Sequence, residues 1–308
     1  MSPLYPAESR RLRGLSCRLA AMPRHEYPDL EEPPEVAVAF ETVVPWHLWG
    51  VGELEGFHRT SQGYERFLAS SGAFAALGHH EEIEDWQCDI RHIAGLASAR
   101  SYGSLRHIAT LDEMAELVAS DLAAPISEAQ LRKLLKAHRR GPSGHDCPAW
   151  HFFRHLWDER LFLYDHGDGR HFLAARYIAG QLGLPVPLRA RLHVYGISSE
   201  AVCRLRRSYE MFVLSKQAMA REDFLEEMRR REATYLWHPM PEAYQDNYGV
   251  FLPRSEPRSM EVAAALHEAG VFDLGLHLKR LATMSGRLER PSCRPLSSTA
   301  CAKYRVEP

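Results

Sequence analysis

One stretch near the middle of the chain constrains the fold most, because four local patterns follow one another within it. Residues 161–164 form a short apolar run of the kind that makes a buried strand. Two glycines then indicate a tight turn, and residues 170–182 have the pattern of a helix that is closed by a third glycine. Residues 188–195 alternate between apolar and polar side chains, which is typical of a half-buried strand. We therefore predict strand, turn, helix and strand in this order.

Helical spacing of apolar residues dominates the region before this stretch, from residue 64 to residue 156. Two stripes carry this prediction, the first made of Tyr64, Phe67, Leu68 and Phe74 and the second of Ile83, Trp86, Ile90, Ile93 and Leu96. Thr110 with Glu113, and Ser127 with Gln130, have the spacing of a capping box ahead of an apolar run. We therefore expect helices through most of this region, with helix starts near these two pairs.

These patterns together predict an α+β fold, in which a helical N-terminal half packs on a small mixed β-sheet with helices in the C-terminal half. Proline and arginine are frequent in residues 1–35, which we expect to form a flexible basic arm. Residues 36–156 form the mainly helical region and residues 157–284 the α/β region, which are either two domains or one interleaved core. We expect residues 285–308 to be a mobile tail.

The charge balance is close to neutral, with 38 Lys and Arg residues against 40 Asp and Glu residues and a net charge of −2. This balance gives no overall attraction to nucleic acid or to an anionic membrane surface. No apolar run approaches the ~18 residues that a membrane-spanning helix needs. Six scattered cysteines without a CxxC pair are typical of free thiols in a reducing compartment. We therefore expect a soluble cytoplasmic protein with no membrane partner, and nothing here indicates a nucleic-acid partner.

The turn before the predicted helix is the first candidate site. Gly167 and Gly169 would expose backbone N–H groups at the positive end of the helix, a geometry that binds phosphate or carboxylate. Arg170 and His171 stand in the first helical turn, from which both could reach the same anion. Asp168 could cap the helix, act as a base or bind a metal. We therefore take Asp168 and His171 as candidate catalytic residues, and the two glycines, Arg170 and His171 as candidate ligand-binding residues.

Residues 161–195 also resemble a known family at this turn. The matching features, in chain order, are Asp168-Gly169-Arg170-His171, Ala174-Ala175, Gly183 and Pro185-Val186-Pro187. This order is similar to that of the ParB/sulfiredoxin superfamily, in which a strand leads into an Asp-Gly-x-His-Arg turn and an Ala-Ala-containing helix. The resemblance implies a nucleotide-phosphate site, with His171 and the turn amides at the phosphates. The chain departs from that pattern at Phe172, which stands where the superfamily has arginine.

Histidine supplies the second candidate site. His151 and His155 are four residues apart on a predicted helix and would share one face. Other imidazole or thiol ligands lie nearby in the sequence at His145, Cys147 and His166. Nitrogen and sulfur ligands of this kind bind Zn²⁺, although the chain has neither an HExxH nor a CxxC motif.

Three functions are compatible with these features. The first is an enzyme or switch that binds a nucleotide or another phosphate-bearing ligand at residues 168–171. The second is a hydrolase that uses a divalent metal ion bound within the His-rich residues 145–171. The third is a non-enzymatic module that binds a protein partner, in which the turn only caps a helix. The sequence leaves open whether the protein is an enzyme, and its cofactor would be a nucleotide or a divalent metal.

Overall fold

The computed structural model describes residue 30 and residues 37–97, 107–140, 150–158, 160–164 and 169–287. Contacts divide the chain into two compact units, each assembled from separate segments. Unit 1 contains Val44–His79 and Gly196–Arg287, and unit 2 contains Pro33–Val43 and His80–Tyr195. The division into residues 36–156 and 157–284, as two domains or as one interleaved core, stays a prediction.

Unit 1 is built on a five-stranded sheet, here called sheet 1, with the strand order β2-β1-β9-β10-β8. The strands are β1 (Leu54–Thr60), β2 (Gly63–Ala69), β8 (Tyr209–Ser215), β9 (Tyr235–Pro239) and β10 (Asn247–Pro253). All neighbouring strands run antiparallel. A two-residue loop joins β1 to β2, where Thr60 pairs with Gly63. Gly63 has a φ of 138°, a conformation that glycine adopts without steric cost.

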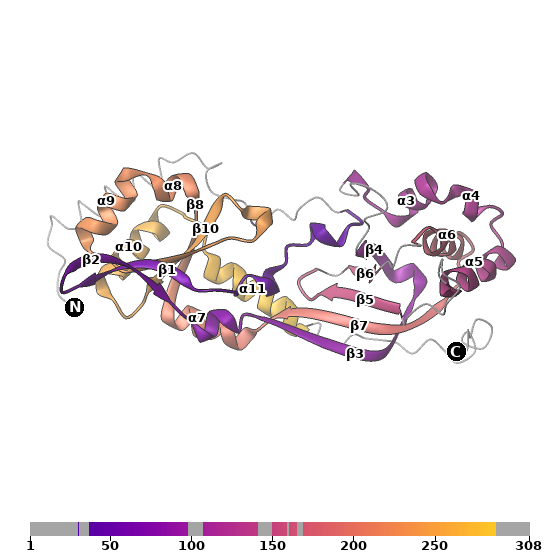
Figure 1. Ribbon diagram of the computed structural model, residues 1–308, viewed down its shortest axis with the longest axis horizontal. Coiled ribbons are helices and arrows are strands. Elements are labelled where there is room, and N and C mark those ends of the chain that lie inside the picture. Colours follow the sequence, from indigo (N-terminus) through magenta and orange to yellow (C-terminus); the bar gives the residue numbers. More distant parts are fainter. Residues whose placement is uncertain are drawn as a thin grey trace. The chain divides into compact units, whose positions relative to one another are not determined.

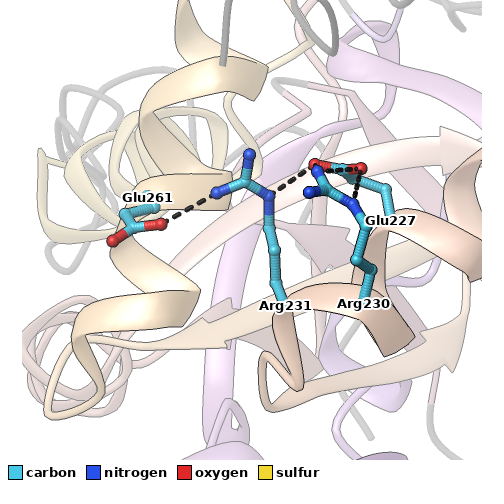
Figure 2. A network of polar contacts seen from close by, with 4 residues as sticks. All are labelled: Glu227, Arg230, Arg231 and Glu261. Carbon is cyan, nitrogen blue, oxygen red and sulfur yellow. Dashed lines mark hydrogen bonds and ion pairs between the residues drawn. The ribbon is translucent and has the colours of Figure 1, made fainter. Parts of the chain in front are cut away.

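Helices cover sheet 1. They are α2 (Gly72–Ala75), α7 (Ser199–Ser208), α8 (Lys216–Ala220), α9 (Glu222–Arg231), α10 (Pro257–Glu268) and α11 (Leu274–Arg287). One face of the sheet joins α8, α9 and α10 in a core that includes Phe212, Leu252, Phe224 and Leu266. Figure 2 shows the polar contacts that connect α9 to α10. Arg231 Nε donates to Glu227 Oε1 at 2.6 Å, and Arg231 Nη1 donates to Glu261 Oε2 at 2.8 Å.

Unit 2 contains the second five-stranded sheet, here called sheet 2, with the strand order β3-β7-β5-β6-β4. The strands are β3 (Gly78–Asp89), β4 (Ile93–Ala97), β5 (Trp150–His155), β6 (Leu161–Tyr164) and β7 (Pro187–Ile197). The sheet is mixed, because β5 runs parallel to β7 and antiparallel to β6, and β4 runs parallel to β6.

The helices of unit 2 are α3 (Leu111–Val118), α4 (Ser120–Ala123), α5 (Glu128–Arg140) and α6 (Gly169–Gln181). In Figure 1, α3, α4 and α5 gather around α6, and α6 has contacts with all three. Their buried side chains meet one face of sheet 2 in a single core, which includes Phe152, Leu163, Phe172 and Leu192. The other face of sheet 2 carries the polar and aromatic residues described in the next subsection.

The expected helical N-terminal half is wrong. Residues 54–97 form β1, β2, β3 and β4, and α2 is a single turn of four residues. Among residues 64–156, helices longer than four residues occur only at α3 and α5, within the part that the structure describes. The α+β composition holds, but strands dominate the first half of the chain and helices are more frequent in the second.

An irregularity in β3 explains why apolar residues of this strand have a helix-like spacing. Asp85 has a φ of 55°, in the left-handed region. Glu84 and Asp85 both pair with arginines of β7, so two successive side chains face the same side, as in a β-bulge. Ile83 and Trp86 therefore both pack against the core although they are three residues apart. This gap of three imitates the period of a helix.

Several local predictions are confirmed. The elements expected from residue 161 to residue 195 are β6, α6 and β7. Thr110 Oγ1 accepts a hydrogen bond from the Glu113 N–H at the start of α3, and Ser127 Oγ accepts one from the Gln130 N–H at the start of α5.

Within the described ranges, no helix combines the length and the apolar character needed to cross a membrane.

Candidate metal site on the open face of sheet 2

Two of the residues expected at the predicted turn, and three of the expected metal ligands, lie outside the described part of the chain. This applies to Gly167 and Asp168, and also to the metal-ligand candidates His145, Cys147 and His166. The nucleotide-phosphate site and the superfamily resemblance therefore stay predictions.

The described residues of this turn begin α6. Gly169 is buried, Arg170 is exposed and His171 is half-buried. The Arg170 guanidinium donates to Asp121 at 2.7 Å and to the Val118 carbonyl at 2.7 Å. The hydrogen bond from Arg170 lowers the pKa of Asp121 below its usual value. An anion at this turn would therefore have to compete with Asp121 for the positive charge of Arg170.

His151 and His155 lie on the strand β5, so the predicted helix is wrong at these residues. They still share one face, because a separation of four residues is a whole number of repeats in a strand. His155 is buried among rings, with centroids 4.8 Å from Phe40 and 4.8 Å from Trp157. His151 lies instead beside His193 of β7, with its Nδ1 2.8 Å from His193 Nε2. The two histidines therefore have different surroundings.

Three potential metal ligands come together at the neighbouring strands β3 and β7. His80 Nε2 is 3.2 Å from His193 Nδ1, and Glu82 Oε1 is 3.6 Å from the same nitrogen. One ligand atom from each of the three residues lies within 4.8 Å of the other two. We call these three residues the His80–Glu82–His193 cluster.

The strand pattern explains why these side chains meet. His80 and Glu82 are two residues apart on β3 and therefore point to the same face. On β7, Leu192 and Val194 enter the core beneath α6, so His193 between them points to the opposite face. Because β3 and β7 are hydrogen-bonded neighbours in sheet 2, the cluster forms on the face opposite to the one that packs against the helices of unit 2.

Aromatic rings hold the two imidazoles in place. The His193 ring stacks on Phe153 at 4.9 Å with an interplanar angle of 16°, and the His80 ring stacks on Tyr195 at 4.9 Å with an angle of 22°. The two imidazoles are themselves nearly parallel, at 8°. Stacking on both sides restricts rotation of the rings, so the ligand nitrogens are positioned before any ion binds.

Electrostatics favour the neutral form of His193. Burial lowers the pKa of His193 below its usual value; His151, His80 and Arg191 lower it further, and Glu82 opposes them. A neutral imidazole is the form that binds a metal ion. His193 is therefore ready to act as a ligand near neutral pH.

Two of the three separations between ligand atoms fit a small transition-metal ion. With metal–nitrogen distances of about 2.0–2.1 Å, ligand atoms around a tetrahedral ion lie about 3.3 Å apart. The separations from His193 Nδ1 to His80 and to Glu82, 3.2 and 3.6 Å, lie close to this value, and the ligand atoms of His80 and Glu82 lie within 4.8 Å of each other. The cluster could thus accept an ion with small side-chain movements.

Sequence reasoning missed all three residues of the cluster. The alternation of residues 188–195 places His193 on the polar face of a predicted strand but assigns it no role, and His80 and Glu82 fall in a region predicted as helix. The sequence does carry one signal for this pair. If residues 78–84 are taken as a strand, His80 and Glu82 are two residues apart and point to the same face. Of the candidates that were named, the structure brings only His151 to the cluster, among the residues that it describes.

Comparison with known proteins adds the family. Residues 83–289 match the Family of unknown function (DUF6685), in a range that includes His193 and begins directly after Glu82. No curated protein and no solved structure matches the chain. Because the matched range covers more than half of the sequence, the chain belongs to the DUF6685 family.

Proposed function

We propose that the protein is a metal-dependent hydrolase that binds one divalent transition-metal ion at the His80–Glu82–His193 cluster. The observation that carries this proposal is the meeting of three ligand atoms within 4.8 Å of one another on adjacent strands. The ligands come from positions 113 residues apart in the sequence, so the folded sheet creates the site.

The ligand types determine the class of ion. Two imidazole nitrogens and one carboxylate oxygen suit Zn²⁺ and its first-row neighbours, whereas Ca²⁺ and Mg²⁺ prefer oxygen ligands throughout. Three protein ligands also leave a coordination position open, which is typical of catalytic rather than structural zinc sites. A bound ion of this kind supplies the acidity that makes water a nucleophile near neutral pH. Hydrolysis is therefore the reaction class that we assign.

His151 supports the site by fixing the tautomer of His193. If His193 Nδ1 faces the ion, its Nε2 carries the proton and donates to His151 Nδ1 at 2.8 Å. Hydrogen bonds of this kind orient a metal-binding imidazole and raise its basicity. His151 is thus a positioning residue in this proposal.

Arg191 supports Glu82 in a comparable way. Its Nη2 donates to Glu84 Oε1 at 2.7 Å, and its Nη1 lies 3.7 Å from Glu82 Oε2. The Glu82 Oε1 atom is left facing His193. Arg191 therefore attracts one carboxylate oxygen of Glu82 while the other points at the proposed ion.

Isothermal titration calorimetry of the metal-free full-length chain with Zn²⁺ tests the proposal. We expect one high-affinity site per chain that His80→Ala, Glu82→Gln or His193→Ala each removes. Removing a ligand leaves two protein donors, which hold Zn²⁺ far less tightly. Release of acetate from p-nitrophenyl acetate, a simple ester, then reports whether the bound ion activates water.

Two matched variants control for general effects of substitution. Glu81→Gln removes an exposed carboxylate from β3 between the two ligands, where strand alternation turns it to the other face. His92→Ala removes an exposed histidine outside the cluster. Both should bind Zn²⁺ as the unaltered chain does. Equal binding by the His80→Ala and His92→Ala proteins would overturn the proposed site, and tight binding without ester hydrolysis would overturn the reaction class.

We also assign this activity to the cytoplasm. Cys88 and Cys203 are free thiols, and Cys203 is exposed. Free exposed thiols persist in reducing compartments and are oxidised in secretory ones, which supports a cytoplasmic location.

A further inference from the structure

A cavity of about 560 Å³ lies in unit 1 and is lined by residues of sheet 1, of α7 and of the adjoining loops. Its volume falls in the range of pockets that bind small organic molecules, about 300–1,000 Å³. It is separate in sequence from the proposed metal site, because all of its lining residues belong to unit 1. The lining residues indicate which class of small molecule the cavity could bind.

Part of the cavity lining is apolar and aromatic. Phe67, Leu236 and Tyr209 line it, and the His58 ring lies 4.2 Å from Phe67, centroid to centroid. Gly56 allows this arrangement, because a Cβ at residue 56 would lie 2.9 Å from Phe67 Cε1. A flat apolar group could therefore stack on these rings.

The lining includes a cation that no acid neutralises within the described part of the chain. Arg207, at the end of α7, lines the cavity together with Ser208 and Ser255, and no hydrogen bond or ion pair to a described residue holds its side chain. Two nearby arginines differ from it in this respect, since Arg204 pairs with Glu200 and Arg254 pairs with Glu210. Arg207 is therefore available to an anionic ligand.

The acid in the lining is already occupied. Glu256 Oε2 accepts hydrogen bonds from the Thr234 N–H at 2.9 Å and from Ser259 Oγ at 2.5 Å. Burial raises the pKa of Tyr209, so its phenol stays protonated and can donate a hydrogen bond. The other polar side chains of the lining are those of Arg207, His58, Thr234, Tyr209 and the two serines, and each of them can donate a hydrogen bond.

We propose that this cavity binds a small organic anion with a planar apolar body, of the aromatic carboxylate class. The carboxylate would form charge-assisted hydrogen bonds with the Arg207 guanidinium, which matches its planar two-oxygen geometry. The ring of the ligand would stack against Phe67 and Leu236. The proposal does not depend on the metal site, which lies in the other unit.

Titration calorimetry of the full-length chain with benzoate tests the proposal, with benzamide and benzylamine as matched probes of neutral and positive charge. We expect benzoate to bind and the other two to bind at least tenfold more weakly. Arg207→Gln should weaken benzoate by about tenfold or more, because it removes a charged hydrogen-bond donor. Arg204→Gln, on the same helix but outside the cavity lining, should leave binding unchanged.

A second variant tests the position of the ligand without changing charge. Ala69→Trp places a large ring in the cavity lining and should abolish benzoate binding while the chain keeps its circular dichroism spectrum. Tighter binding of benzylamine than of benzoate would show that Glu256 dominates the cavity and would overturn the proposal. Absence of benzoate binding, or equal loss in the Arg207→Gln and Arg204→Gln proteins, would overturn it as well.

Discussion

Two adjacent residues of β7 should have separable roles, because the strand directs them to opposite faces of sheet 2. Leu192 is fully buried in the core beneath α6, whereas His193 faces the proposed metal site. We therefore expect Leu192→Ala to weaken folding and His193→Ala to abolish metal binding.

The magnitudes follow from what each side chain touches. Truncating a fully buried leucine costs about 2–5 kcal/mol, since it removes apolar contact and leaves a cavity. His193→Ala loses ring contacts with Phe153, His80 and His151 and hydrogen bonds with the two histidines, and each such contact is worth about 0.5–1.5 kcal/mol. Both variants should therefore lose stability, and zinc binding rather than the size of that loss distinguishes them.

Urea denaturation followed by far-ultraviolet circular dichroism measures the stability, and calorimetry with Zn²⁺ measures the binding. The Leu192→Ala chain should unfold at lower urea but bind Zn²⁺ under native conditions. The His193→Ala chain should not bind Zn²⁺ under conditions in which it is folded. The reverse pattern, with zinc binding kept in the His193→Ala chain and lost from a still folded Leu192→Ala chain, would refute the assignment of faces.

Two further predictions concern charge. Because the pKa of His193 is lowered in the fold, the unfolded chain takes up this proton first as pH falls below the ordinary histidine pKa of about 6.5. Stability should therefore fall between pH 7.5 and pH 5.5, and less so in a His193→Gln chain, when urea midpoints are compared. In the network of Figure 2, Arg231→Met should cost about 2 kcal/mol by the same assay, because its largely buried guanidinium bonds two acids. Arg230→Met should cost under about 1 kcal/mol, because Arg230 is 46% exposed, and equal costs would contradict this reasoning.

The sequence predicts helices and strands well where the spacing of apolar residues agrees with the glycine and capping residues at the ends of each element. Strand β6, helix α6 and strand β7 follow a clear order of apolar run, helix and alternation, and the capping residues Thr110 and Ser127 mark two helix starts. Local chemistry decides these features, so they can be read without knowledge of the tertiary fold.

In the first half of the chain the spacing of apolar residues wrongly predicts helices, and part of this error has a physical reason. The bulge at Asp85 moves Trp86 into the core three residues after Ile83, which produces helical spacing inside a strand. In β5, His151 and His155 share a face whether the segment is a helix or a strand, so their spacing cannot separate the two.

The candidate site could be predicted only in part. His151 was recognised from its spacing, but His80 and Glu82 meet His193 only because β3 and β7 pair in the folded sheet. Strand pairing across more than a hundred residues leaves no local trace in one sequence, since it depends on register and sheet order.

X-ray absorption spectroscopy at the zinc edge, on the full-length chain loaded with one equivalent of Zn²⁺, tests the central claim most directly. The account predicts a first shell of nitrogen and oxygen at about 2.0–2.1 Å, with the multiple scattering of two imidazoles and no sulfur. The His80→Ala chain should show the scattering of one imidazole at most. A sulfur shell near 2.3 Å, or a spectrum that His80→Ala and His193→Ala leave unchanged, would contradict the assignment of the metal to this cluster.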